Sequence, residues 1–255
     1  MADILVFAAK SEYAEQAQRL AEHLQVDCIA DPAMEGQIHE NREEGLILRF
    51  DDTGLSLCDR KLTMQGDFTA NLSRISKGKW QHEMLVKAAR IKGAAGPITV
   101  VDATAGMGED SLLLAAAGFE VQLFERDPVI AALLEDSLRR AKDIPELEDV
   151  LARMHFHEGD SVEALASMKE RPDVIYLDPM FPERKKSGLI KKKFQLLQQL
   201  ESPCVDGEVL LAAAMKAKPK KIVIKRPAKG PYLADIKADY SITGKTIRYD
   251  CIMVH

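Results

Sequence analysis

The sequence contains few cysteines and no long apolar run. Its four cysteines, Cys28, Cys58, Cys204 and Cys251, include no Cys-x-x-Cys pair, the spacing typical of zinc ligands and redox pairs. We therefore expect reduced, structural cysteines and no metal site. No apolar segment approaches the roughly 18 residues of a membrane span, and Asp3 interrupts the apolar start where a signal peptide would be basic. These absences predict a globular protein of the cytoplasm that does not contact membranes.

Charge is distributed unevenly along the chain. The 255 residues carry a net charge of -5, and 46% are hydrophobic, enough for one large domain or one large and one small domain. The segment from Arg184 to Lys229 holds thirteen Lys or Arg against three acidic residues, a local balance of +10. A basic face on an acidic protein predicts a nucleic-acid partner, and a solvated lysine-rich helix is the alternative.

From Pro97 onward, apolar strand patterns alternate with helical patterns. Strands are expected near residues 98–102, 121–125, 155–157, 174–177 and 222–224, and Pro128 suits the first turn of an intervening helix. Residues 240–254 predict an antiparallel hairpin around Gly244 and Lys245. A mostly parallel α/β sheet that ends in such a hairpin is typical of class I methyltransferases, whose Rossmann-like sheet has seven strands. Ligands of such sheets bind at the carboxyl ends of the strands.

The first part of the chain shows different patterns. Residues 2–9 predict a strand, residues 11–24 a helix with Ser11 as its N-cap, and residues 45–59 a hairpin that turns between Asp51 and Gly54. None of these patterns has the βαβ alternation of the later part. We therefore predict a small N-terminal α/β domain of residues 1–77 and a class I methyltransferase domain of residues 78–255.

The stretch "VVDATAGMGEDS" joins the strand expected at residues 98–102 to a helix. Gly106 and Gly108 have the spacing of a dinucleotide-binding turn, but Ser111 replaces the third glycine. The turn also carries three acidic residues, Asp102, Glu109 and Asp110. Acids oppose the binding of a pyrophosphate at a helix N-terminus. The pattern therefore favours a cationic ligand without phosphate over a nicotinamide dinucleotide, and S-adenosylmethionine has a positive sulfur and an ammonium group.

Two further strand ends carry polar residues suited to the rest of that cofactor. Glu125 ends the strand at residues 121–125, where an acid can accept both ribose hydroxyls of an adenosine. Asp160 and Ser161 follow the next strand, where methyltransferases often hold the adenine amine. Taken alone, Asp160 or Ser161 would be read as a helix N-cap.

The stretch "DPMF" follows the strand at residues 174–177. Asp178, Pro179 and Phe181 resemble the Asp/Asn-Pro-Pro-aromatic motif of methyltransferases that modify exocyclic amines of bases, although Met180 replaces the second proline. Such an amine is a poor nucleophile, so the site must supply acceptors for its N–H groups. The Asp178 carboxylate and the Pro179 carbonyl can accept these protons, and Phe181 offers a surface on which an unstacked base can lie. We interpret these three residues as catalytic.

The stretches "VVDATAGMGEDS", "LFERDPVIAALL", "YLDPMFPERKKS" and "VIKRP" together resemble the bacterial ribosomal RNA small subunit methyltransferase J family. The resemblance extends from about Trp80 to the end of the chain. It implies methylation of N2 of a guanosine in 16S rRNA, with S-adenosylmethionine as donor and the rRNA or the 30S subunit as partner. It also implies cofactor contacts at Glu109, Asp110, Glu125, Arg126, Asp160, Ser161 and Asp178. Family members carry a basic residue where Glu109 stands, so the contact there is with either its side chain or its backbone.

Basic residues adjoin the predicted catalytic loop. Lys185 and Lys186 follow it directly, and Lys225 and Arg226 end a neighbouring strand, so all four are candidate contacts for RNA phosphates. Three alternatives stay open at this point. The chain could be a nicotinamide oxidoreductase, a non-catalytic RNA-binding assembly factor, or a methyltransferase that acts on adenine, DNA or a glutamine side chain.

Overall fold

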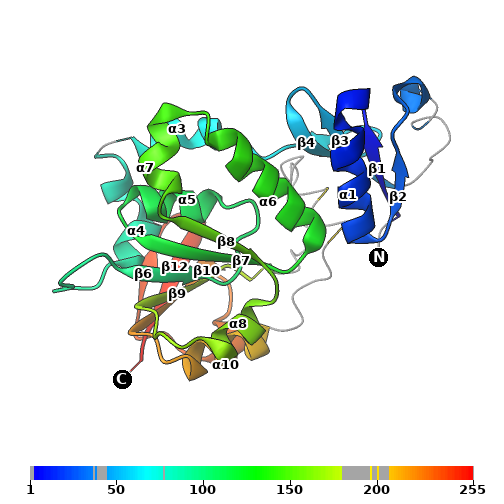
Figure 1. Cartoon of the computed structure of the whole chain (residues 1–255). Helices are drawn as coiled ribbons and strands as arrows, with labels where there is room; N and C mark the ends of the chain where they lie inside the picture. The colour runs from blue at the N-terminus through cyan, green and yellow to red at the C-terminus, as the bar shows by residue number, and fades with distance from the viewer. Residues whose placement is uncertain are drawn as a thin grey trace.

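The computed structural model describes residues 3–36, 38, 45–76, 78–179, 196, 200 and 207–254. Its strands form two sheets (Figure 1). A five-stranded sheet near the N-terminus has the order β2-β1-β3-β4-β5, and a seven-stranded sheet has the order β11-β12-β10-β9-β6-β7-β8. Within the described ranges, no helix has both the length and the apolar character needed to cross a bilayer.

The seven-stranded sheet confirms the predicted class I architecture. Its parallel strands are β6 (Thr99–Asp102), β7 (Glu120–Glu125), β8 (Met154–Glu158), β9 (Val174–Leu177) and β10 (Lys221–Pro227). The hairpin of β11 (Tyr240–Thr243) and β12 (Ile247–Met253) completes it, with β12 antiparallel to β10. β7 pairs with one edge of β6 and β9 with the other, so the strand order reverses there. A crevice for ligands is expected outside the carboxyl ends of strands at such a reversal.

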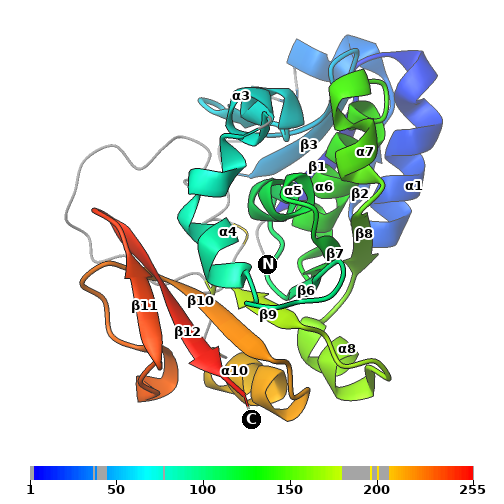
Figure 2. The same cartoon turned by 90° about the vertical axis from the view of Figure 1, so that its left-hand side faces the viewer.

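Helices cover both faces of this sheet (Figure 2). The buried residues of α4 (Met84–Ala89) and α5 (Glu109–Ala116) pack on one face, and those of α8 (Ser161–Ser167) and α10 (Gly207–Lys216) pack on the other. α7 (Glu148–Leu151) lies on the α5 side. The chain also forms short helical turns: η1 (Ser11–Tyr13), η2 (Pro32–Met34), η3 (Phe68–Asn71), α3 (Leu72–Ile75), η4 (Trp80–His82), η5 (Pro145–Leu147) and η6 (Leu233–Asp235).

Helix α6 (Pro128–Ala141) lies between the two sheets, as Figure 1 shows. The Asp127 carboxylate caps it by accepting the N–H groups of Val129 and Ile130, and Pro128 occupies the first turn as predicted. Leu134 packs in the core of the seven-stranded sheet, whereas Val129 and Leu133 pack with apolar residues of the N-terminal sheet. One helix therefore contributes to the cores of both sheets.

The N-terminal sheet contains β1 (Ile4–Ala8), β2 (Asp27–Ile29), β3 (Leu46–Asp51), β4 (Gly54–Cys58) and β5 (Thr63–Met64). The hairpin of β3 and β4 confirms the predicted turn. The expectation of no βαβ unit was wrong, because α1 (Ala14–Leu24) joins β1 to a parallel β2. β2 has three residues and none is fully buried, so it leaves no apolar pattern. Ser11 begins the turn η1 and does not cap a helix.

The predicted domain boundary near Lys77 stays a prediction, and Lys77 lies outside the described residues. Phe68 and Ile75, which precede it, pack in the core of the seven-stranded sheet. This segment brings α3 beside α5, at the end of the sheet where the glycine turn lies.

Candidate active site at the carboxyl ends of β6, β9 and β10

Asp102 ends β6 and anchors the glycine turn. The side chain is 1% exposed, and its Oδ2 accepts a 2.6 Å hydrogen bond from Ser111 Oγ while Oδ1 accepts a 3.1 Å bond from the Thr104 N–H. Burial raises the pKa of Asp102 to about 7. Ser111, the residue that replaces the third glycine, thus ties the first turn of α5 to the strand end. Asp102 shapes the turn from inside the protein.

The two glycines of the turn meet different surroundings. Both have positive φ, 54° at Gly106 and 75° at Gly108, a conformation that favours glycine. A Cβ on Gly108 would lie 2.7 Å from Cδ1 of Leu134 and 3.3 Å from the Phe68 ring. A Cβ on Gly106 would meet no atom within 4 Å. Gly108 therefore permits close packing, whereas Gly106 has open space beside its backbone.

Glu125 connects the turn to the end of β7. It is 8% exposed, and its two carboxylate oxygens accept 2.8 Å hydrogen bonds from the N–H groups of Gly106 and Asp127. Burial raises its pKa, and these hydrogen bonds partly offset that rise. Each carboxylate oxygen has a further lone pair, so Glu125 can still accept hydroxyl groups.

Asp178 follows β9 and is joined to the same turn. Its backbone N–H donates a 2.7 Å hydrogen bond to Thr104 Oγ1. Its side chain is 36% exposed, and Pro179 beside it is buried. Parallel pairing of β6 with β9 brings the ends of the two strands together. The Asp178 carboxylate therefore faces the crevice on a fixed backbone.

Lys225, at the end of β10, bridges two carboxylates. Its Nζ lies 2.8 Å from Oδ2 of Asp110 and 2.8 Å from Oδ2 of Asp178. Tyr176 Oη donates a 2.7 Å hydrogen bond to the same Asp110 oxygen. The Tyr176 ring packs against Tyr249 of β12, with ring centroids 6.4 Å apart.

Burial and ion pairing shift the pKa values of these groups in opposite directions. Burial raises the pKa of Asp178, and attraction by Lys225 offsets part of the rise. At Asp110 burial acts in the same direction, but Lys225 and Tyr176 outweigh it and lower the pKa. Burial alone would lower the pKa of Lys225, whereas the two carboxylates raise it overall. Lys225 is therefore a permanent cation, and Asp110 is ionised at neutral pH.

The other sequence-predicted cofactor residues lie near the same strand ends. Asp160 caps α8 by accepting a 2.7 Å hydrogen bond from the Val162 N–H, and Ser161 is buried in its first turn. Glu109 and Arg126 are exposed, at the start of α5 and just after β7. Of the residues predicted to contact the base or RNA, Phe181, Lys185 and Lys186 lie outside the described residues.

The structure buries Arg226, whose expected contact with an RNA phosphate stays a prediction. Successive residues of a strand point to opposite faces, so Lys225 and Arg226 cannot share one rim. Arg226 is 2% exposed and donates from Nε to the Pro231 carbonyl oxygen at 2.9 Å. Burial beside Arg248 lowers its pKa to about 10. Lys225, by contrast, is held by the Asp110 and Asp178 carboxylates.

Sequence reasoning missed Tyr176 and Thr104. Tyr176 lies two residues before Asp178 in a central strand, and residues i and i+2 of a strand share a face, so the alternation pattern could have indicated it. Thr104 lies within the glycine turn, but its bond to Asp178 joins residues 74 positions apart. No local pattern reports such a contact.

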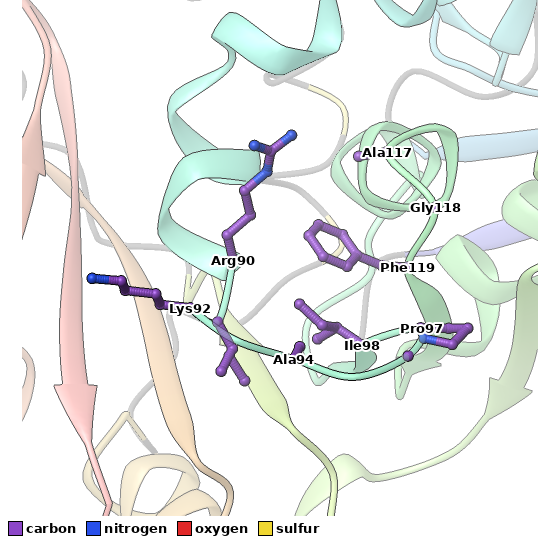
Figure 3. Close-up of a pocket in the computed structure, with 10 residues that line it drawn as sticks. Arg90, Lys92, Ala94, Pro97, Ile98, Ala117, Gly118 and Phe119 are labelled. Atoms are coloured by element: carbon purple, nitrogen blue, oxygen red, sulfur yellow. The ribbon is translucent and has the colours of Figure 1, made fainter.

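A separate hollow of about 540 Å³ lies at the amino end of β6, away from the crevice. Figure 3 shows Ile98 and Phe119 in this hollow, between the loop that carries Lys92 and the end of α5. The glycine turn follows the opposite end of β6, so the hollow contains none of the site residues. Among the described residues, no cluster of three or more His, Cys, Asp or Glu side chains could hold a metal ion.

Comparison with known proteins gives concordant results. A protein-family model described as "Putative SAM-dependent methyltransferase" matches residues 33–254. The chain is 39% identical to the ribosomal RNA small subunit methyltransferase J of Pseudomonas aeruginosa, over 96% of this chain and 92% of that protein. It is 45% identical to the protein of the same name from Aeromonas salmonicida, over 68% of this chain and 70% of that protein.

A solved structure supports the same assignment. The crystal structure of a SAM-dependent methyltransferase from Neisseria gonorrhoeae matches with a TM-score of 0.73 and 32% identity, and the match covers 99% of this chain and 96% of that one. The residues at these strand ends also suit the cofactor. Gly106 leaves backbone open, and the Asp110 and Asp178 carboxylates suit a cationic donor without phosphate. The chain belongs to the ribosomal RNA small subunit methyltransferase J family, an S-adenosylmethionine-dependent methyltransferase family.

Proposed function

We propose that this enzyme transfers a methyl group from S-adenosylmethionine to the exocyclic N2 of a guanosine in 16S rRNA, guanosine 1516 in the usual bacterial numbering. The name and 39% identity of the Pseudomonas aeruginosa relative support rRNA as the substrate. The observation that carries the chemistry is the partly exposed Asp178 carboxylate beside the glycine turn. Such a substrate places the enzyme in the cytoplasm with the small ribosomal subunit.

In this proposal, residues at the ends of β6, β7 and β8 hold the cofactor. Gly106 offers its open backbone, Glu125 accepts the ribose hydroxyls, and Asp160 with Ser161 lies where the adenine amine would bind. Asp110 and Asp178 share the single positive charge of Lys225, so a net negative charge remains that favours a cationic donor. The buried Asp102 holds the turn that the donor contacts. Glu109 and Arg126, both exposed, would contact the outer part of the cofactor.

S-adenosylmethionine, when bound, would supply an electrophilic methyl group, and it would leave as S-adenosylhomocysteine when the bond between the methyl carbon and sulfur breaks. The Asp178 carboxylate and the Pro179 carbonyl accept the two N–H groups of the guanine amine and orient its nitrogen toward the methyl carbon. As the N–C bond forms, positive charge develops on the amine, and the nearby carboxylate stabilises it. The methylated amine is then a cation with an acidic proton, which passes to water through the Asp178 carboxylate that accepts its N–H. Asp178 therefore acts chiefly as an acceptor that positions the amine.

Exposed lysines near the crevice are the proposed contacts for RNA phosphates. Lys229 lies in the loop after β10, and Lys245 lies in the turn between β11 and β12; both are exposed. A 2.9 Å hydrogen bond from the Ala228 N–H to the Thr246 carbonyl joins the two loops. The Arg248 guanidinium fixes the first loop by donating to the carbonyl oxygens of Pro227, Ala228 and Gly230. We assign to Lys229 and Lys245 the role first expected of Arg226.

The experiment that tests the function measures transfer of a radiolabelled methyl group from S-adenosylmethionine. The substrates are 30S subunits that lack the modification and the deproteinised 16S rRNA from them. We expect incorporation at a single guanosine, with the label on N2. Label on an adenine or on a protein side chain would contradict the proposed substrate, and no incorporation by an enzyme that binds S-adenosylhomocysteine would favour a non-catalytic assembly factor.

A further inference from the structure

The sheet itself places Lys225 beside Asp178. β10 pairs in parallel with β9, and Ile224 lies opposite Leu177, so the next residues of the two strands, Lys225 and Asp178, are neighbours at the carboxyl edge. The ammonium group lies 2.8 Å from Oδ2 of Asp178. The other oxygen, Oδ1, accepts no hydrogen bond from any residue within the described ranges. One carboxylate oxygen is thus held by the protein and the other is available.

A second set of contacts holds Lys225 in turn. Asp110 Oδ2 accepts from Lys225 Nζ at 2.8 Å and from Tyr176 Oη at 2.7 Å. The Lys225 side chain is 25% exposed, so the ammonium group is removed from most of the solvent. An ammonium held between two carboxylates in fixed directions has little freedom to follow an RNA phosphate.

We propose that Lys225 is a positioning residue for the methyl transfer: it fixes one oxygen of Asp178, so that the other oxygen accepts the N–H of the guanine amine. This inference rests on the proposed function of Asp178. Asp110 and Tyr176 support this role because they fix the position of the Lys225 ammonium. Lys225 touches neither base nor donor in this role and acts through Asp178.

The electrostatics of the crevice explain why a cation is needed there. Ionisable groups from five elements and one connecting residue face Asp178 and Asp110. They are Asp102 at the end of β6, Tyr176 of β9, Lys225 of β10, Tyr249 of β12, Arg74 of α3, and Glu83 just before α4, which pairs with Arg74. Without Lys225, Asp178 would keep its burial and the repulsion from Asp110, and both raise its pKa. Asp178 would then keep its proton to a higher pH than in the wild type, and a protonated carboxyl is a poorer acceptor.

The test compares Lys225→Met, Lys225→Arg and the matched control Lys237→Met, which removes an exposed lysine of the same domain. Measurements are kcat and KM for 30S subunits or rRNA, the pH profile of kcat, and S-adenosylhomocysteine affinity by calorimetry. For Lys225→Met we expect kcat to fall by roughly 100-fold, with KM for RNA within about threefold of wild type. The acid limb of its pH profile should move to higher pH.

The remaining variants separate positioning from folding. Lys225→Arg retains a cation and should recover a large part of kcat and the wild-type pH profile even if Lys225→Met unfolds more easily. Lys237→Met should behave as wild type. The inference is overturned if Lys225→Met keeps its kcat, or if its loss appears in KM for RNA with a reduced salt dependence, since that result identifies a phosphate contact. If the wild-type enzyme itself does not methylate rRNA, the proposed function is contradicted. That result differs from the two outcomes for Lys225→Met, which contradict only the role of Lys225.

Discussion

Thr104 Oγ1 accepts a 2.7 Å hydrogen bond from the backbone N–H of Asp178. This bond joins the glycine turn after β6 to the end of β9, the two strands between which the order of the sheet reverses. Gly106 in the turn is open to the cofactor, and Asp178 is the proposed acceptor for the substrate amine. The hydroxyl of Thr104 therefore fixes Asp178, the proposed acceptor of the amine, relative to the turn that contacts the methyl donor.

Replacing Thr104 with Val keeps the side-chain shape and removes that acceptor. An Asp178 N–H left unpaired costs on the order of 1 to 3 kcal/mol, so we expect kcat to fall by about tenfold or more. Thr104→Ser retains the hydroxyl and should keep most of kcat. Steady-state methyl transfer with the two variants checks this. Equal activities would show that the bond does not position Asp178.

Asp178→Ala removes the proposed acceptor for the guanine amine. We expect methyl transfer to be abolished while folding and most of the cofactor affinity remain, because Lys225 keeps its contact with Asp110. Transfer assays, calorimetry with S-adenosylhomocysteine and thermal unfolding measure the three properties. Full activity of this variant would refute the assigned role of Asp178.

Asp102→Asn tests the buried carboxyl at the end of β6. Folding raises the pKa of Asp102 from 3.8 to about 7, so the folded protein binds more protons than the unfolded chain between these values. The free energy of unfolding must therefore fall as pH rises from about 4 to about 7, and the contribution becomes constant above that range. We expect the wild type to lose stability relative to Asp102→Asn over this interval in urea unfolding. A difference that does not change with pH would mean that Asp102 titrates normally.

Gly106→Ala and Gly108→Ala form a matched pair. Both place alanine at positive φ, which costs about 1 kcal/mol, but only Gly108→Ala brings a Cβ within 2.7 Å of Leu134. We expect Gly108→Ala to lose about 3 kcal/mol of unfolding free energy. Gly106→Ala should be more stable than Gly108→Ala but should bind S-adenosylhomocysteine at least about tenfold more weakly, because its methyl group enters the cofactor side. Denaturation and calorimetry measure both effects, and the reverse ranking would contradict the assigned geometry.

Lys229→Gln and Lys245→Gln test the proposed phosphate contacts. Each contact releases counterions on binding, so each substitution should weaken rRNA binding and reduce the slope of log affinity against log salt by about one. Lys237→Gln is the matched control and should leave the slope unchanged. Measurements of rRNA affinity at several salt concentrations test this expectation. An unchanged slope in the double variant would exclude both lysines.

The main elements of the larger sheet could be predicted because their signals are local. Val174–Leu177 is a short apolar run that ends at "DPMF", and Pro128 marks the start of α6 beside a capping Asp127. β2 could not be found, since its three residues are partly exposed and it is defined by pairing with β1. Periodicity in the sequence reflects the alternation of buried and exposed residues, and a short edge strand has almost no such alternation.

The sequence by itself determined the class of the site: the glycine turn, the acids at strand ends and Asp178 follow from local patterns and indicate a cationic cofactor. Only the tertiary structure decided what each charge does. It buried Arg226 at the carbonyl of Pro231 and brought Lys225 between Asp110 and Asp178. The physical reason is that electrostatic roles depend on distances across the sheet, and strands far apart in sequence meet only when the chain folds.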